Sequence, residues 1–213
     1  MKTKNIDVMM SIAGSDNTCG AGVQADIKTC QSLHSYCLNC LTAVTSQNSK
    51  KVFKIFELPK NIVESQILTI LSEYKVNSIK IGLIKSVSQA KVILKVLKKK
   101  EISVPIVVDP IYKSTTNTIF NKRSDYLEIY TILSMLKPIF TPNLYELKIL
   151  LKLKKNIDID SMILNFYKKF RCTVVLTNAG TKKEKCDDFF LNEKKKIKKI
   201  TFDKIVSRNT HGS

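Results

Sequence analysis

The sequence predicts an α/β protein in which helices cover both faces of a mainly parallel sheet. Short, almost continuous apolar segments, typical of buried parallel strands, alternate along the 213 residues with segments whose apolar side chains recur at helical spacing. Several apolar segments run directly into a glycine or a polar side chain, as strands do where they enter a loop. This alternation is typical of the crossover units that build a parallel sheet.

The N-terminal half carries four predicted strands and three predicted helices. The strands are expected at residues 6–13, 37–46, 52–58 and 77–82. The helices are expected at about residues 21–34, at 61–74, and from Ser86 onward. The strand at 52–58 alternates in character and is expected to be half-exposed. Ser86 and Gln89 have the spacing of a capping box, in which each side chain bonds the backbone of the other residue.

The C-terminal half continues the alternation. Strands are expected at residues 104–108, 138–140 and 172–177, and helices at about 124–136, 144–153 and 159–169. The tail, with its Lys- and Ile-rich stretch at 194–200, is expected to form a β-hairpin with a solvated lysine face. We find no linker and no internal repeat, so residues 1–213 are predicted to form a single domain.

Composition excludes several classes of protein. Hydrophobic residues make up 44% and charged residues 25%, which is ordinary for a globular protein, and no apolar run approaches the roughly 20 residues of a membrane helix. The net charge of +18 would attract nucleic acid, but only three of the 36 basic residues are the arginines that nucleic-acid readers favour. Cys30 and Cys40 lie among apolar neighbours, as reduced core cysteines do. We therefore expect a cytoplasmic protein without a nucleic-acid or membrane partner.

Glycines and polar residues gather where the predicted strands end. Gly14 to Asp26, Gln47, Gly82, Asp109 and the segment 143–146 all lie at or just beyond a strand end. In open α/β sheets ligands bind beyond the carboxyl ends of the strands. This edge is therefore the predicted binding site for a small molecule.

The first of these segments reads IAGSDNTCGAGVQAD, residues 12–26. Its glycines allow close approach of backbone to a ligand, but their spacing is neither that of a dinucleotide fingerprint nor that of a Walker loop. Asp26, in the first turns of the following helix, has two interpretations. It interacts favourably with the helix dipole, or it accepts a hydrogen bond from a hydroxyl or amino group of the ligand.

The segment resembles the opening IAGSDPSGGAGIQADLKT of the hydroxymethylpyrimidine and phosphomethylpyrimidine kinases of thiamine synthesis, which have the ribokinase-like fold. The resemblance extends in order along the chain. TAVTSQNS (42–49) is similar to TALTAQNT, IKIGLI (79–84) to IKIGML, VVDPIYKSTTNT (107–118) to VVDPVMVATSGH, TPNLYE (141–146) to TPNLPE, and NTHGS (209–213) to the start of NTHGTGCTFSSA. The resemblance implies a three-layer α/β/α domain.

It also implies a function and a set of site residues. The function is ATP-dependent phosphorylation of 4-amino-5-hydroxymethyl-2-methylpyrimidine and of its monophosphate, with ATP and Mg²⁺ as cofactors. The implied substrate-binding residues are Gly14, Asp26, Gln47, Leu83 and Ile111. The implied nucleotide-binding residues are Asn143 and Thr177, and the implied metal ligands are Asp109 and Glu146. An amide such as that of Gln47 donates and accepts side by side, which suits an aminopyrimidine.

Two departures from the family pattern bear on catalysis. VLTNAG (175–180) stands in the place of VLVKGGH, so the family's phosphate-contacting lysine is missing from this segment, with Lys182 and Lys183 nearby in sequence. The sequence ends at Ser213, ahead of the Gly-Thr-Gly anion hole and the cysteine at the base position. We assign no catalytic residue. We expect a C-terminally truncated fold and little kinase activity from these 213 residues alone, since phosphoryl transfer relies on charge stabilisation.

Three alternatives follow from the same residues. The first is a catalytically impaired pyrimidine-binding protein, because the substrate motifs match better than the nucleotide motifs. The second is a pyridoxal kinase of the same superfamily. Gln47 and the glycine-rich segment favour the pyrimidine as substrate over pyridoxal. The third is a basic nucleic-acid binder, which the salt dependence of DNA binding would reveal. The resemblance also allows a homodimer.

Overall fold

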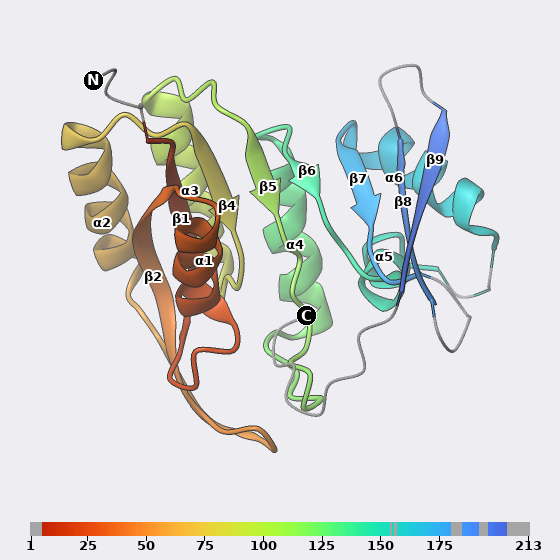
Figure 1. The fold of residues 1–213 in the computed structure, drawn as a ribbon, viewed down its shortest axis with the longest axis horizontal. Coiled ribbons are helices and arrows are strands. Elements are labelled where there is room, and N and C mark those ends of the chain that lie inside the picture. The colour runs from red at the N-terminus through yellow and green to blue at the C-terminus, as the bar shows by residue number, and fades with distance from the viewer. Residues whose placement is uncertain (1–5, 154, 156, 180–184, 192–195, 204–213) are drawn as a thin grey trace.

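The computed structural model describes residues 6–153, 155, 157–179, 185–191 and 196–203 (Figure 1). Its strands are β1 (Val8–Asp16), β2 (Tyr36–Gln47), β3 (Val52–Glu57), β4 (Ser78–Ile81), β5 (Ile106–Val108), β6 (Ile139–Phe140), β7 (Thr173–Leu176), β8 (Lys185–Leu191) and β9 (Ile197–Asp203). Its helices are α1 (Gly22–Ser32), α2 (Lys60–Glu73), α3 (Val87–Lys99), α4 (Arg123–Ser134), α5 (Leu144–Leu150) and α6 (Ile159–Phe170). Every strand and helix predicted from the sequence is present, with ends shifted by a few residues.

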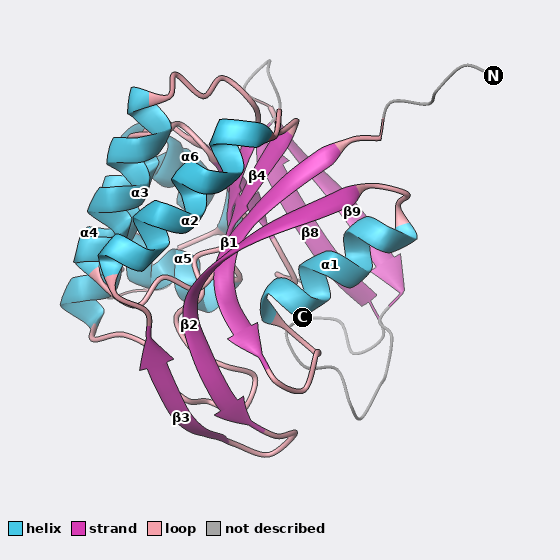
Figure 2. Cartoon of the chain, turned by 90° about the vertical axis from the view of Figure 1, so that its left-hand side faces the viewer, coloured by secondary structure: helices cyan, strands magenta, loops and turns pink. Residues whose placement is uncertain are grey.

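The nine strands form one sheet in the order β3-β2-β1-β4-β5-β6-β7-β8-β9. The pairs from β2 through β7 are parallel, while β3, β8 and β9 are antiparallel to their neighbours. Figure 2 shows α1 on one face and the other described helices on the opposite face. The predicted α/β architecture with helices on both faces is therefore confirmed, as is the C-terminal hairpin.

The main core lies between the sheet and the helices α2, α3, α4 and α6. The apolar side chains of α3 that recur at helical spacing, including Ile93 and Leu97, are fully buried there. Tyr126, Tyr130 and Phe140 continue this core in edge-to-face ring contacts with centroids 4.7–6.4 Å apart. Burial of such large side chains is the main favourable contribution to folding.

The predicted capping box at Ser86 is half correct. The Ser86 hydroxyl accepts a hydrogen bond from the Gln89 backbone N–H at 3.3 Å, as expected. The Gln89 side chain, however, accepts from the N–H of Lys85 and donates to the carbonyls of Thr42 and Leu58, both at 2.8 Å. A fully buried amide thus joins α3 to the β2–β3 hairpin, because burial requires all its polar groups to be paired.

The two predicted core cysteines are buried, and the lysines of the tail that the structure describes are exposed, as predicted; residues 194 and 195 lie outside the described residues. Cys30 and Cys40 are buried, and all six cysteines are free thiols. Lys198 and Lys199 are exposed on β9, where Lys199 pairs with Asp187 at 3.0 Å. No helix in the described ranges is long and apolar enough to cross a bilayer.

The carboxyl ends of the parallel strands all open onto one edge of the sheet. The turn between β1 and α1 is tight there, because a Cβ on Gly22 would lie only 2.3 Å from the carbonyl oxygen of Gly14. Gly22 also has a φ of 61°, a left-handed conformation that disfavours side chains. The same turn contains Cys19, which adopts φ 59° without being glycine.

These two positions predict opposite effects on stability. Gly22→Ala is expected to lower the free energy of unfolding by about 2 kcal/mol or more, because it combines a left-handed conformation with a backbone clash. Cys19→Gly is expected to raise it by about 0.5 kcal/mol, since relief of strain exceeds the added entropy of the unfolded chain. Urea denaturation measures both. Equal stability of Gly22→Ala and the wild type would contradict this geometry.

Candidate active site

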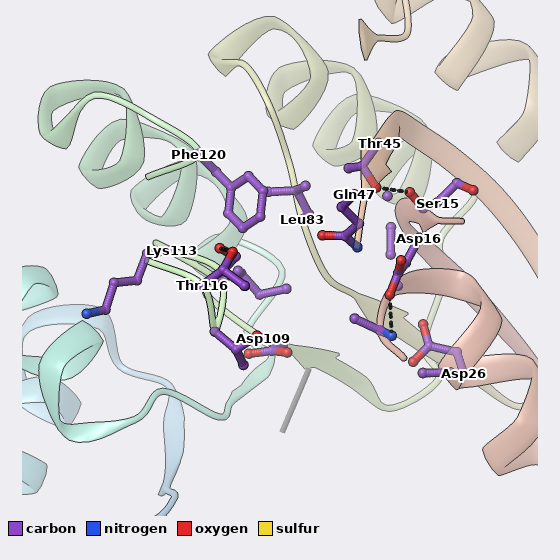
Figure 3. A pocket seen from close by; sticks show the side chains of 18 of the residues that line it. Ser15, Asp16, Asp26, Thr45, Gln47, Leu83, Asp109, Lys113, Thr116 and Phe120 are labelled. Atoms are coloured by element: carbon purple, nitrogen blue, oxygen red, sulfur yellow. Dashed lines mark hydrogen bonds between the residues drawn. The ribbon is translucent and has the colours of Figure 1, made fainter. Parts of the chain in front are cut away.

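A cavity of about 440 Å³ opens at the carboxyl edge of the sheet (Figure 3). Its wall includes the turn between β1 and α1, the end of β2, the loop after β5 and the start of α5. All the site residues named from the sequence line it: Gly14, Asp26, Gln47, Leu83, Asp109, Ile111, Asn143, Glu146 and Thr177. Residues up to 163 positions apart in sequence thus surround one space, because parallel strands share a carboxyl edge.

Asp16 organises the turn between β1 and α1. One carboxylate oxygen accepts from the N–H and the hydroxyl of Thr18, both at 2.8 Å. The other accepts from the N–H groups of Ala21 at 2.8 Å and Gly20 at 3.1 Å. Burial raises the pKa of this carboxyl, but hydrogen bonds from Thr18, Gln47 and Ala21 outweigh it and leave the pKa below its ordinary value. Asp16 therefore stays charged and holds the turn in place.

Three further hydrogen bonds, made by the side chains of Gln24 and Asn17, hold this turn in place. The Gln24 side chain accepts from the Asp16 N–H at 2.8 Å and donates to the Ser15 hydroxyl at 2.7 Å. The Asn17 side chain accepts from the backbone N–H of Gln47 at 2.8 Å. Asn17, where the family pattern has proline, thus fixes the end of β2 against the turn. Figure 3 shows the Gln47 side chain beside Asp16, on the cavity side.

Asp26 is held by an ion pair that the sequence analysis did not identify. Lys80 on β4 contacts both carboxylate oxygens, at 2.9 and 3.0 Å, and the Ser11 hydroxyl donates to one of them at 2.5 Å. Ser11 and Lys80 are polar residues within largely apolar strands, and this feature of the sequence could have indicated a buried polar partner. They are paired in register across β1 and β4. Asp26 lines the cavity with most of its hydrogen-bonding capacity already used.

Two more carboxylates face the cavity. Asp109 lies deep in it, where burial raises its pKa to about 6. None of the hydrogen bonds found among the described residues involves its carboxylate oxygens. Burial likewise raises the pKa of Glu146 to about 7, while both of its oxygens accept backbone N–H groups, from Tyr112 at 3.1 Å and Asn143 at 3.0 Å. Glu146 and Asn143 form a reciprocal capping box at the start of α5.

This donor set fits Mg²⁺ bound in its usual way. Mg²⁺ retains several waters and is held by one or two carboxylates together with substrate phosphates. Asp109 offers free oxygens, and Glu146 retains lone pairs beside its two N–H contacts. Among the described residues no cluster of three or more His, Cys, Asp or Glu side chains has the arrangement of an all-protein metal site. The cavity therefore suits a cation that arrives with phosphate oxygens.

The apolar wall of the cavity is fixed from behind. The carbonyl of Leu83 accepts from the buried Thr42 hydroxyl at 2.5 Å. The loop after β5, which carries Ile111 and Phe120, is attached by Lys85, whose ammonium donates to the carbonyl of Phe120. Asn121 adds a hydrogen bond to the Ile84 carbonyl at 2.9 Å. These buried contacts preorganise the wall around a ligand.

A sequence profile of the family described as phosphomethylpyrimidine kinase matches residues 16–213. The chain belongs to the phosphomethylpyrimidine kinase family. It is 33% identical over 210 residues to the probable thiamine biosynthetic bifunctional enzyme, chloroplastic, of Oryza sativa subsp. japonica. That match covers 96% of this chain and 38% of the rice protein, so the chain spans well under half of that relative.

Solved structures agree with membership of the phosphomethylpyrimidine kinase family. The phosphomethylpyrimidine kinase of Clostridium difficile superposes with a TM-score of 0.79 at 28% identity, covering 91% of this chain and 83% of that one. The pyridoxal kinase of Staphylococcus aureus in complex with pyridoxal gives a TM-score of 0.82 at 26% identity, covering 98% and 76%. The ribokinase-like fold is thereby established for this chain.

The departures of this chain from the phosphomethylpyrimidine kinase pattern fall at special backbone positions. Cys19 and Asn117 each stand where the pattern has glycine, and each has a positive φ, of 59° and 64°; Asn178, in the segment that replaces VLVKGGH, has a φ of 50°. Asparagine tolerates this region better than most residues. Thr177 is placed beside Asn143 by a parallel bridge, with its N–H bonded to the Pro142 carbonyl at 2.9 Å. Lys182, Lys183 and the segment 209–213 lie outside the described residues.

The raised pKa of Asp109 predicts a pH-dependent stability in the absence of metal. The folded state binds its proton up to about pH 6 and the unfolded state only to about pH 4, so stability falls as the pH rises through that window. Asp109→Asn is expected to exceed the wild type in unfolding free energy by about 1–3 kcal/mol at pH 8 and to lose the advantage near pH 4. Denaturant titrations across pH measure this, with the exposed Asp203→Asn as control. A pH-independent difference between Asp109→Asn and the wild type would contradict the assignment.

Proposed function

We propose that this chain carries the substrate site of a kinase that phosphorylates 4-amino-5-hydroxymethyl-2-methylpyrimidine and its monophosphate with ATP and Mg²⁺. The single observation behind the proposal is the shared cavity. It has amide and hydroxyl groups with an apolar wall at one end, and two carboxylates beside a helix N-terminus at the other. Membership of the phosphomethylpyrimidine kinase family supports this chemistry.

In the proposed complex the pyrimidine lies between the turn after β1 and the apolar wall. Gln47 pairs with a ring nitrogen and the exocyclic amine, because its amide donates and accepts side by side. Gly14 permits close approach of the ring, and Leu83 and Ile111 contact its faces. Asp26 has one lone-pair position left beyond Lys80 and Ser11, which suits a single hydrogen bond from the substrate.

The nucleotide phosphates and Mg²⁺ occupy the other end in this proposal. Asp109 and Glu146 hold the cation, which neutralises charge on the transferring phosphate. Asn143 caps α5 with its side-chain oxygen on the Glu146 N–H at 2.9 Å, so the phosphates approach a preformed helix start. Thr177, beside Asn143, lines this end of the cavity, with its N–H held by the Pro142 carbonyl.

Pyridoxal is the second candidate substrate, because the pyridoxal kinase of S. aureus superposes on this chain as well as the phosphomethylpyrimidine kinase does. The single-domain organisation, the cytoplasmic location, the homodimer and the absence of a nucleic-acid partner stay predictions from the sequence. The rice relative carries a chloroplastic name, so location differs among similar proteins.

The role of Gln47 predicts a specific loss of binding. Gln47→Ala is expected to weaken hydroxymethylpyrimidine binding by roughly 1–3 kcal/mol, because the buried polar groups of the substrate then lack partners. Isothermal titration calorimetry measures the change. Gln31→Ala removes an exposed amide from α1 and serves as the matched control, with unchanged affinity expected. Equal affinities for the wild type and Gln47→Ala would remove Gln47 from the site.

Substrate preference separates the two candidate functions. The wild-type chain is expected to bind hydroxymethylpyrimidine at least tenfold more tightly than pyridoxal, roughly the effect of one well-placed hydrogen bond. Competition between the two ligands in the same calorimeter gives the ratio directly. A preference for pyridoxal would overturn the proposed substrate while leaving the fold assignment intact.

A further inference from the structure

One basic side chain of the cavity has no role in the function described so far. Lys113 lies in the loop after β5 and lines the cavity together with Asn143, Glu146 and Thr177. Figure 3 shows its side chain extending away from Asp26 and Gln47. It is therefore on the side of the cavity that the proposed function gives to the nucleotide.

The backbone around Lys113 is well defined. Lys113 forms an antiparallel bridge with Ile119, and a tight turn between them is closed by hydrogen bonds of 2.9 Å from Ser114 to Thr118 and from Asn117 to Ser114. Asn117 occupies the left-handed position of that turn with φ 64°. The small hairpin fixes where the lysine side chain starts.

The ammonium group of Lys113 is oriented but not neutralised. It donates to the Asn117 side chain at 2.9 Å and lies 4.9 Å from the centre of the Tyr145 ring, in the first turn of α5. No ion pair of Lys113 with a carboxylate occurs within the described residues. Its charge nevertheless reaches Glu146, whose pKa it lowers against the larger effect of burial.

We propose that Lys113 binds the phosphate groups of the nucleotide at the start of α5. Lys113 is half-buried, and its ammonium, which contacts an amide and an aromatic ring, keeps donors available for phosphate oxygens. The segment VLTNAG (175–180), which stands in the place of VLVKGGH, carries no lysine here, so Lys113 supplies a positive side chain to that end of the cavity. This inference rests on the proposed function for the identity of its ligand.

The test compares nucleotides that differ in phosphate number. Lys113→Met is expected to weaken ATP binding about tenfold, as loss of a charge-assisted hydrogen bond does, and to leave adenosine binding unchanged. Lys113→Arg is expected to retain most of the affinity for ATP. Lys91→Met, which removes an exposed lysine of α3, is the matched control and is expected to bind ATP as the wild type does.

The readout is the dissociation constant for each nucleotide, with thermal melts to verify that every variant is folded. Unchanged ATP affinity in Lys113→Met, an equal loss in Lys91→Met, an equal loss for adenosine, or no ATP binding by the wild type would each overturn the proposal. Hydroxymethylpyrimidine affinity is measured in parallel. Failure of the pyrimidine to bind, with the Lys113 effect on ATP intact, would reject the proposed substrate and keep this inference.

Discussion

The turn between β1 and α1 is the feature on which the rest of the site depends. Asp16 gathers four hydrogen-bond donors from Thr18, Gly20 and Ala21, and the bare Cα of Gly22 passes the Gly14 carbonyl where no side chain fits. A charged carboxylate buried with this many donors is rigid, since any rearrangement leaves it unpaired. The turn thereby forms part of the cavity wall and holds the end of β2 against it.

Charge divides the cavity into two ends. Near the turn, the negative charge of Asp26 is neutralised by its ion pair with Lys80. The polar groups at this end of the cavity therefore carry little net charge, which suits a neutral heterocycle. Farther along the cavity, Glu146 is buried and Asp109 is half-buried, and neither forms an ion pair among the described residues. Removal from water raises the pKa of both carboxyls, and the charge of Lys80 partly offsets this effect at Asp109. That excess negative charge favours a divalent cation, and Lys113 beside it favours the phosphates that accompany one. In the proposed function this division separates the pyrimidine from the nucleotide phosphates and their cation.

Sequence reasoning reached the fold and the cavity wall because both follow from local patterns. Apolar runs ending in polar residues gave the strands, and a shared carboxyl edge then implied that Gln47, Asp109 and Asn143 meet. The Lys80–Asp26 ion pair could not be predicted from the sequence, because it depends on the register of β4 against β1 and on the rotation of α1 about its axis. The Gln89 side chain was misassigned for a similar reason, since tertiary carbonyls offered it better partners than its own helix end did.

The most direct measurement is a crystal structure of the chain with hydroxymethylpyrimidine and a non-hydrolysable ATP analogue in the presence of Mg²⁺. We expect the pyrimidine against Gln47 and Leu83, with the triphosphate and the cation near Asp109 at the opposite end of the same cavity. Binding of the pyrimidine outside this cavity, or of both ligands at the same end, would contradict the division of the site derived from its charges.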